Sequence, residues 1–298
     1  MNGRRADALL LAATAIWGVS FVVVKAALAY ATPLAFVSVR FALSTLVLAP
    51  GTAVSPRPTR GEIGGALLLT GLLAVGFATQ NVGLVHTTPA RSAFIVALSS
   101  VLAPPIAFVA LGQRTRWLTV GALGLAGGGT YLLTAPDAGG LNRGDLWTLV
   151  TAVAFGAQIV AVRELAVRYD ARRLVWLQTA GTALAVGLAA LLLESSRVRW
   201  TPVFVALLAY CAVFPTAVAF LWQMRAQRHM SSGRAALIFC FEPLFAALTS
   251  WVVLGERLTP TQWLGGALIL LGMIGADLAA LRAPARSVQD RIRSAHLR

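Results

Sequence analysis

Charged side chains are scarce in this sequence of 298 residues. Asp, Glu, Lys and Arg together make up 12% of it, whereas apolar residues make up 58%. Soluble domains carry about a quarter of charged residues, so this composition excludes an ordinary soluble protein. It predicts an all-α protein that lies in a lipid bilayer.

Cysteine is almost absent, and the patterns of metal sites and enzymes are missing. Cys211 and Cys240 fall inside apolar stretches, so we interpret them as small buried residues. The sequence contains no clustered metal ligands, no glycine-rich loop that could hold a phosphate, and no Ser, His and Asp set on a soluble face. It therefore predicts no disulfide framework, no metal, no cofactor and no enzyme activity.

Acidic residues are also few, which leaves a net charge of +14. Such a charge could indicate a nucleic-acid-binding protein, because basic patches neutralise phosphates. Here, however, the basic residues are mostly arginines in short connections between apolar runs, and no stretch combines basic and aromatic residues on a soluble face. We therefore expect the lipid bilayer, and no nucleic acid, as a partner.

Long apolar stretches, by contrast, recur along the whole chain. Each is long enough to cross a hydrocarbon core of about 30 Å. Prolines and charged residues punctuate them and predict ten transmembrane helices, at residues 7–29, 33–50, 62–85, 89–112, 117–135, 143–165, 171–193, 201–226, 232–254 and 260–281. The first stretch could also be a signal peptide, but the nine further spans favour an uncleaved helix.

The basic residues are distributed unevenly between the two sides of these spans. They concentrate in the connections on the side of the N-terminus and in the C-terminal segment 283–298, which we expect to be a disordered tail. Because positive charges near helix ends stay in the cytoplasm, both termini are predicted to be cytoplasmic. The expected location is the bacterial cytoplasmic (inner) membrane.

The sequence also matches itself when it is shifted along its own length. At an offset of 138 residues, Asp7 meets Asp145, Gly18 meets Gly156 and Lys25 meets Arg163. At an offset of 143 residues, the matches are Phe77 with Phe220, Gln80 with Gln223, His86 with His229, Arg91 with Arg234, Leu111 with Leu254, Gly112 with Gly255 and Arg114 with Arg257. Chance gives a few such matches, but their order and their places at corresponding helix ends favour a duplication.

This duplication predicts two five-helix repeats, at residues 1–138 and 139–282. Because five is odd, the second repeat enters the membrane from the opposite side, so the repeats are inverted. Inverted repeats suit alternating access, in which two equivalent bundles move around a site near the bilayer midplane. The repeat therefore favours a transporter over other membrane proteins.

Three stretches resemble the drug/metabolite transporter superfamily, and in particular its EamA-type members. They are residues 15–25, which begin with Ala-Ile-Trp-Gly, residues 38–41, and the C-terminal segment 241–272. The resemblance covers roughly residues 6–280 and implies ten helices, inverted halves and, in many members, export of metabolites. Gln113 stands where the family usually has Glu, and Ser99-Ser100 lies opposite Glu242-Pro243, which counts against any mechanism needing a carboxylate in each half.

Amide side chains in the third predicted helix and in its repeat mate are the first group of candidate substrate-binding residues. In hydrocarbon an amide needs a hydrogen-bonding partner or a polar cavity. These amides either bind substrate or merely hold helices together, and the sequence leaves both readings open. The residues concerned are Gln80, Asn81 and Gln223, with Phe77 and Phe220 on the same helix faces.

Aromatic residues in the first and sixth predicted helices form a second group. Trp17 and Phe21 lie on one face of the first helix, and Phe155 and Gln158 fall at the corresponding place in the sixth. Aromatic walls around a few polar groups are typical of a small-molecule pocket, although core packing would explain the rings equally well. We expect Trp17 and Gln158 to line a cavity.

Two charged residues are expected inside the membrane. Arg40 lies about seven residues into the second helix, and we interpret it as a structural tie to backbone carbonyls. Glu242 is expected ten residues into the span 232–254, next to Pro243. Without a fixed partner, a buried carboxylate becomes able to exchange a proton, so Glu242 is a candidate for proton coupling, for a structural pair or for direct substrate contact.

Arg91 and Arg234 begin the fourth and ninth predicted helices on opposite sides of the membrane. Their symmetry makes them gate candidates, although helix capping or contact with lipid phosphates would also explain them. Glycines in the fifth and tenth helices allow close helix packing, either between the halves or between two copies in a homodimer.

Together these features predict a secondary transporter for a small polar or amphipathic metabolite, such as an amino acid or a related compound, which it exports by alternating access. The alternative is a membrane enzyme or a lipid-headgroup-handling protein without transport. That class should show acids, His or Ser clustered at one membrane face, and the sequence contains no such cluster.

Overall fold

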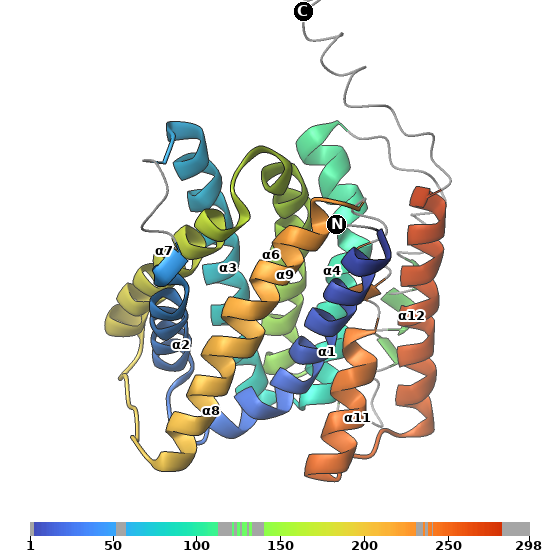
Figure 1. Ribbon diagram of the computed structural model, residues 1–298. Helices are drawn as coiled ribbons and strands as arrows, with labels where there is room; N and C mark the ends of the chain where they lie inside the picture. The colour runs from blue at the N-terminus through green and yellow to red at the C-terminus, as the bar shows by residue number, and fades with distance from the viewer. Residues whose placement is uncertain are drawn as a thin grey trace, which may run out of the picture.

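The computed structural model describes residues 3–51, 58–112, 140–230 and 241–281, together with isolated positions between 121 and 132 and between 235 and 239. In these residues the chain is a bundle of long helices (Figure 1). Their one contact of β type is an isolated bridge between Ala31 and Val198 in connections between helices.

The helices follow one another without strands between them in the part of the chain that the structure describes. They are α1 (Gly3–Ala27), α2 (Pro33–Leu48), the short turn η1 (Ala49–Gly51), α3 (Arg60–His86), α4 (Pro89–Leu111), α6 (Arg143–Arg168), α7 (Ala171–Leu193), α8 (Pro202–Ala212), η3 (Val213–Val218), α9 (Ala219–Gln227), α11 (Glu242–Leu254) and α12 (Pro260–Leu281).

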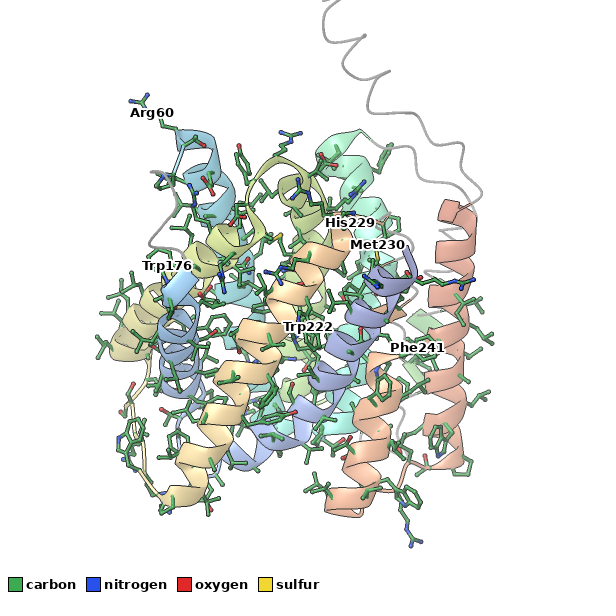
Figure 2. The ribbon with its side chains drawn as sticks, viewed as in Figure 1. Arg60, Trp176, Trp222, His229, Met230 and Phe241 are labelled. Carbon is green, nitrogen blue, oxygen red and sulfur yellow. The ribbon has the colours of Figure 1, made fainter. Side chains whose placement is uncertain are left out.

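Six of these rods have the length and the apolar composition needed to cross a membrane: α1, α3, α4, α6, α7 and the continuous rod from α8 to α9. Helices α2 and α11 are apolar but shorter. Large apolar side chains cover the outer faces (Figure 2), and Leu191, Leu192 and Leu193 at the end of α7 are 72–80% exposed. Lipid, not water, is the solvent that such a surface requires.

Most predicted helix boundaries lie within a few residues of the observed ones, because prolines and capping residues mark the helix ends. Thr59, Thr88 and Asn142 each accept a hydrogen bond from the third residue of the helix that follows. The fifth predicted helix and the tail 283–298 lie outside the described residues, apart from the isolated positions between 121 and 132.

The expected helix 232–254 is wrong in one respect that concerns the site. Helix α11 begins at Glu242, so this residue stands at a helix N-terminus and not in a helix interior. Pro243 explains the difference, because proline has no N–H to donate and its ring clashes with the preceding helical turn. Proline is well tolerated in the first turn, which is where Pro243 lies.

The rod from Pro202 to Gln227 contains a π-helical turn, η3, in its middle. Pro215 lies in this turn and cannot donate to the carbonyl of Cys211, its partner in a regular α-helix. The amide of Ala219 donates to the carbonyls of Phe214 and Thr216. The turn thereby leaves main-chain carbonyls that side chains of other helices can reach.

Helices from the two halves of the chain pack against each other in the bundle. Helix α6 packs against α3 and α4, α7 packs against α2 and α3, and α1 packs against α9 and α11. Helix α12 lies at one edge of the bundle, beside α4 (Figure 1). The centre of the molecule is therefore enclosed by helices from both halves of the sequence.

One contact between a base and a helix end occurs twice. The ammonium of Lys25, in the last turn of α1, donates to the carbonyls of Leu84 and Val85 near the end of α3, at 2.5 and 3.2 Å. The guanidinium of Arg163 in α6 donates to the carbonyls of Gln227 and Arg228, at 3.0 and 3.3 Å. These partners are the ones that the offsets of 138 and 143 residues bring into register.

Candidate functional site

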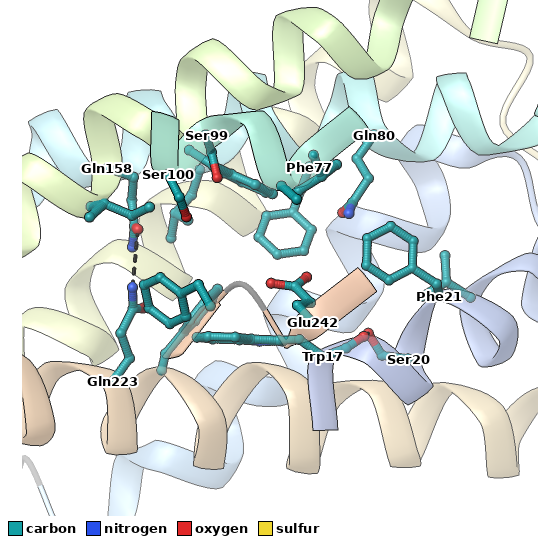
Figure 3. Close-up of a pocket in the computed structure, with 18 of the residues that line it drawn as sticks. Trp17, Ser20, Phe21, Phe77, Gln80, Ser99, Ser100, Gln158, Gln223 and Glu242 are labelled. Carbon is teal, nitrogen blue, oxygen red and sulfur yellow. Dashed lines mark hydrogen bonds between the residues drawn. The ribbon is translucent and has the colours of Figure 1, made fainter. Parts of the chain in front are cut away.

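A cavity lies at the centre of the bundle (Figure 3). Its walls come from helices α1, α2, α3, α4, α6, α9 and α11, and thus from both halves of the chain. The lining residues are Trp17, Ser20, Phe21, Val24, Arg40, Leu73, Phe77, Gln80, Leu84, Val96, Ala97, Ser99, Ser100, Phe155, Gln158, Ile159, Phe220, Gln223, Phe239 and Glu242.

Aromatic rings make up much of the wall and pack against one another. The ring centroid of Trp17 lies 5.9 Å from those of both Phe220 and Phe239. The ring of Phe77 lies 5.2 Å from Phe155 and 5.9 Å from Phe220. Tilted and edge-on pairs at these distances are the favourable arrangement for aromatic side chains. The rings therefore form a stiff apolar wall that also presents π faces to the cavity.

The indole of Trp17 is fixed by the π-helical turn. Its Nε1 donates to the carbonyl of Pro215 at 2.8 Å. A buried indole N–H needs such an acceptor, and in a regular helix this carbonyl would be bonded to the amide four residues later. The irregular turn η3 thus holds one wall of the cavity in place.

Amides from two helices meet at one side of the cavity. The Nε2 of Gln223 in α9 donates to the Oε1 of Gln158 in α6 at 3.3 Å, and both side chains are buried. Gln80 projects from α3 toward the region that the carboxylate of Glu242 also faces (Figure 3). The cavity therefore offers one paired set of amides and a third amide apart from them.

Glu242 reaches the cavity from the N-terminus of α11, where the helix dipole favours a negative charge. Close packing of α1 on α11 brings it there. A Cβ built on Gly18 would lie 2.5 Å from the Cβ of Phe245 and 2.8 Å from the carbonyl of Glu242. Only glycine allows this approach, and the side chain of Glu242 is left facing the rings of α1 and α3.

Arg40 is buried, and its side chain is anchored by the π-helical turn. Its Nε donates to the carbonyl of Cys211 at 3.2 Å and to Oγ1 of Thr216 at 2.8 Å. Its guanidinium carbon lies 5.0 Å from the centre of the Phe77 ring, a cation–π distance. These contacts are of the kind expected for a structural tie, and Arg40 also lines the cavity.

The structure places seven of the eight expected substrate-binding residues in the cavity wall, namely Trp17, Phe77, Gln80, Gln158, Phe220, Gln223 and Glu242. Asn81 is the exception. It is fully buried, and its Nδ2 donates to the carbonyl of Phe77 at 2.8 Å. Successive helical residues point about 100° apart, so Asn81 cannot share the direction of Gln80.

Of the two gate candidates, the one that the structure describes lies away from the cavity. Arg91, at the start of α4, is paired with Asp145 at the start of α6. Arg234 lies outside the described residues.

The cavity lining also includes Ser20 and Phe239, which sequence reasoning missed. Ser20 follows Trp17 by three residues, a spacing that could have indicated it, whereas no sequence pattern singled out Phe239.

A metal centre has no support in the described ranges. Among these residues no group of three or more His, Cys, Asp or Glu side chains could hold a metal ion. Polar chemistry in the described cavity wall comes from amides, hydroxyls, one carboxylate and one guanidinium. Such groups can bind and orient a small molecule.

A bundle of apolar helices with a central cavity of rings and amides is the arrangement of a membrane protein that binds a small molecule. Comparison with known proteins gives the class of membrane transporters, because the EamA-like transporter family model matches the chain twice, over residues 4–135 and 142–276. The chain therefore belongs to the EamA-like transporter family.

The chain is also similar to individual proteins. It is 33% identical to an uncharacterized transporter of Archaeoglobus fulgidus over 274 residues, which cover 92% of this chain and 86% of the relative. It is 25% identical over 198 residues to a probable terminal-alkyne amino-acid exporter of Streptantibioticus cattleyicolor, covering 65% and 66%. A crystal structure with 21% identity shares the fold, with a TM-score of 0.69 over 95% of this chain and 99% of that one.

Proposed function

We propose that this protein is a secondary transporter that exports a small polar or amphipathic metabolite, such as an amino acid or a related compound. The central cavity carries this proposal, because it combines a wall of aromatic rings with three amides and a carboxylate. Aromatic and apolar walls with a few placed polar groups are what a small-molecule site requires. The amino-acid cargo in the name of the Streptantibioticus relative supports the same substrate class.

We further propose alternating access by two inverted halves, residues 1–138 and 139–282, as the mechanism. The twofold family match and the repeated helix-end contact of Lys25 and Arg163 support two related halves. The cavity is walled by both, so a rocking motion between them would expose it first to one side and then to the other. In the bacterial inner membrane, both termini would lie in the cytoplasm.

In this mechanism Gln80, Gln158 and Gln223 orient the polar part of the substrate, and Trp17, Phe77 and Phe220 contact its apolar part. Glu242 is the residue proposed to couple transport to protons, because it is the one acid in the cavity wall as described. Arg91 is proposed as a gate residue at the end of the bundle where α4 and α6 begin.

Flux through the purified protein tests the proposal. The full chain would be reconstituted into liposomes loaded with radiolabelled amino acids and amines, and release would be followed with and without a pH gradient. We expect release above that of protein-free liposomes for at least one compound, and a marked reduction when Trp17 is replaced by Ala. A complete absence of flux over the whole panel, under both conditions, would refute the proposal.

A further inference from the structure

The carboxylate of Glu242 has no hydrogen-bond partner within the described part of the chain, whereas Arg40, the other charged residue of the cavity lining, is hydrogen-bonded. Glu242 is only partly buried and lines the cavity. Burying a charge is costly unless an opposite charge or hydrogen-bond donors compensate it. The occupant of the cavity is the group that could supply this compensation.

Three of the other polar side chains around the cavity are hydrogen-bonded within the protein. Nε of Arg40 is bonded to the carbonyl of Cys211 and to Thr216, and its guanidinium stacks on a ring of the wall. Gln158 and Gln223 are bonded to each other. Among the lining residues, Arg40 and Glu242 are the charged ones, so the negative charge is the more available of the two.

Aromatic rings surround this carboxylate. Figure 3 shows the carboxylate between the rings of Trp17, Phe21 and Phe77, with the amide of Gln80 facing the same space. Ring faces carry partial negative charge and attract cations. Neutral apolar ligands would gain from the rings alone, and anions would be repelled by the carboxylate. A cation with an apolar body gains from both.

We propose that the transported molecule carries an ammonium group, which binds to the carboxylate of Glu242 while its apolar body lies against Trp17, Phe21 and Phe77. The proposal rests on the transport function proposed above and names the chemical class of its cargo. The ammonium donates charge-assisted hydrogen bonds to the carboxylate, and the carbonyl oxygen of Gln80 accepts a further one. Glu242 is then the residue that determines specificity.

Binding to the purified full chain, and not flux, tests this inference. The probes share one apolar body and differ in one group: 2-phenylethylammonium, neutral 2-phenylethanol and anionic 3-phenylpropionate. Isothermal titration calorimetry in detergent at one pH would give three affinities. We expect 2-phenylethylammonium to bind about tenfold or more tightly than 2-phenylethanol, as one charge-assisted contact predicts. The anionic 3-phenylpropionate should bind more weakly than both.

Two variants locate the preference. Glu242→Gln should bind the ammonium and the alcohol with equal affinity, and its unchanged affinity for the alcohol would show that the cavity is intact. Glu164→Gln is the matched control, because Glu164 lies in α6 in an exposed pair with Arg168. It should keep the full preference. Equal binding of ammonium and alcohol by the wild type, no binding of the ammonium at all, or an undiminished preference in Glu242→Gln would overturn the inference.

A fourth probe, L-phenylalanine, separates the two sources of an ammonium group. Affinity equal to that of the amine assigns the cargo to amino acids, and weaker binding assigns it to amines without a carboxylate; each result keeps the requirement for an ammonium. The liposome assay is independent of these titrations. Flux without ammonium preference would refute this inference alone, whereas ammonium binding without flux would refute transport alone.

Discussion

The guanidinium of Arg91 holds both carboxylate oxygens of Asp145. Its Nε lies 2.9 Å from Oδ1 and its Nη2 lies 2.5 Å from Oδ2, and the two side chains are 6% and 0% exposed. Thr87 and the backbone amide of Asn142 donate to the same carboxylate. This pair joins α4 and α6, which belong to two chain segments that the family model matches separately.

The energetics of this pair give the first prediction. Removing one partner leaves a buried charge without compensation, which costs about 3–5 kcal/mol, so Arg91→Met and Asp145→Asn should each destabilise the protein strongly. Unfolding in detergent would measure the loss, and a double variant should lose far less than the sum of the singles. Arg168→Met, which breaks the exposed pair with Glu164, should cost less than about 1 kcal/mol.

If Arg91 acts as a gate, the same variants should open the adjoining end of the bundle. Thr148 lies one turn beyond Asp145 and is fully buried. In a background with both native cysteines replaced, Thr148→Cys should react slowly with a water-soluble maleimide, and at least several-fold faster when Asp145→Asn is added. An unchanged rate would assign the pair to stability alone.

Variants of the Gln158–Gln223 contact can show whether these amides bind substrate or only hold α6 and α9 together. Gln158→Leu or Gln223→Leu alone leaves a buried amide unpaired, at a cost of about 1–3 kcal/mol. The double Leu variant removes both amides and should recover most of that stability. If the amides bind substrate, the recovered protein still transports poorly in the liposome assay. Full flux in the double variant would show that the amides only tie α6 to α9.

Gly18 is predicted to be intolerant of a side chain. In Gly18→Ala the new methyl group would meet Phe245 and the backbone of Glu242, so α11 must move away from α1. Overpacking of this kind costs about 1–3 kcal/mol and would displace Glu242 from the cavity. The control is Gly71→Ala in α3, because a Cβ at that position would have no neighbouring atom within 4 Å. The midpoint temperature of thermal unfolding and the flux should both fall for Gly18→Ala, and both should remain unchanged for Gly71→Ala.

Proton coupling through Glu242 makes a distinct prediction. A glutamine cannot exchange a proton, so Glu242→Gln should still respond to a substrate gradient, if it transports at all, but should lose the response to an imposed pH gradient. Parallel flux measurements with and without the pH gradient would show this. Transport by Glu242→Gln that kept its full dependence on the pH gradient would rule out coupling through this residue.

Much of the helix pattern could be predicted from the sequence, because the signals are local. Apolar runs of spanning length, prolines at helix starts and capping residues all act within a few positions. The start of α11 was missed although its signal is local too. A proline favours the first helical turn, and Pro243 therefore indicates a helix that begins at Glu242 more strongly than one that passes through it.

The cavity was predicted in part, through helical spacing and the internal repeat. Both signals indicated Phe77, Gln80 and Gln223, which line it. Contacts between helices far apart in sequence were not predictable in the same way. Arg91 and Asp145 both occur among the repeat matches, yet their pairing depends on how α4 packs against α6. The angle at which two helices pack cannot be inferred from a single sequence.

The π-helical turn around Pro215 has a consequence for how sequences of this protein can diverge. The atoms that hold Arg40 and Trp17 there include the main-chain carbonyls of residues 211 and 215. Every amino acid carries such a carbonyl, so Cys211 can be exchanged for another small residue without loss of this anchor. Pro215 cannot be exchanged in the same way. Any other residue at this position would have an N–H that could donate to the carbonyl of residue 211, as in a regular α-helix. Among diverging sequences we therefore expect Pro215 to change less than Cys211, although no side-chain atom of Pro215 makes a functional contact.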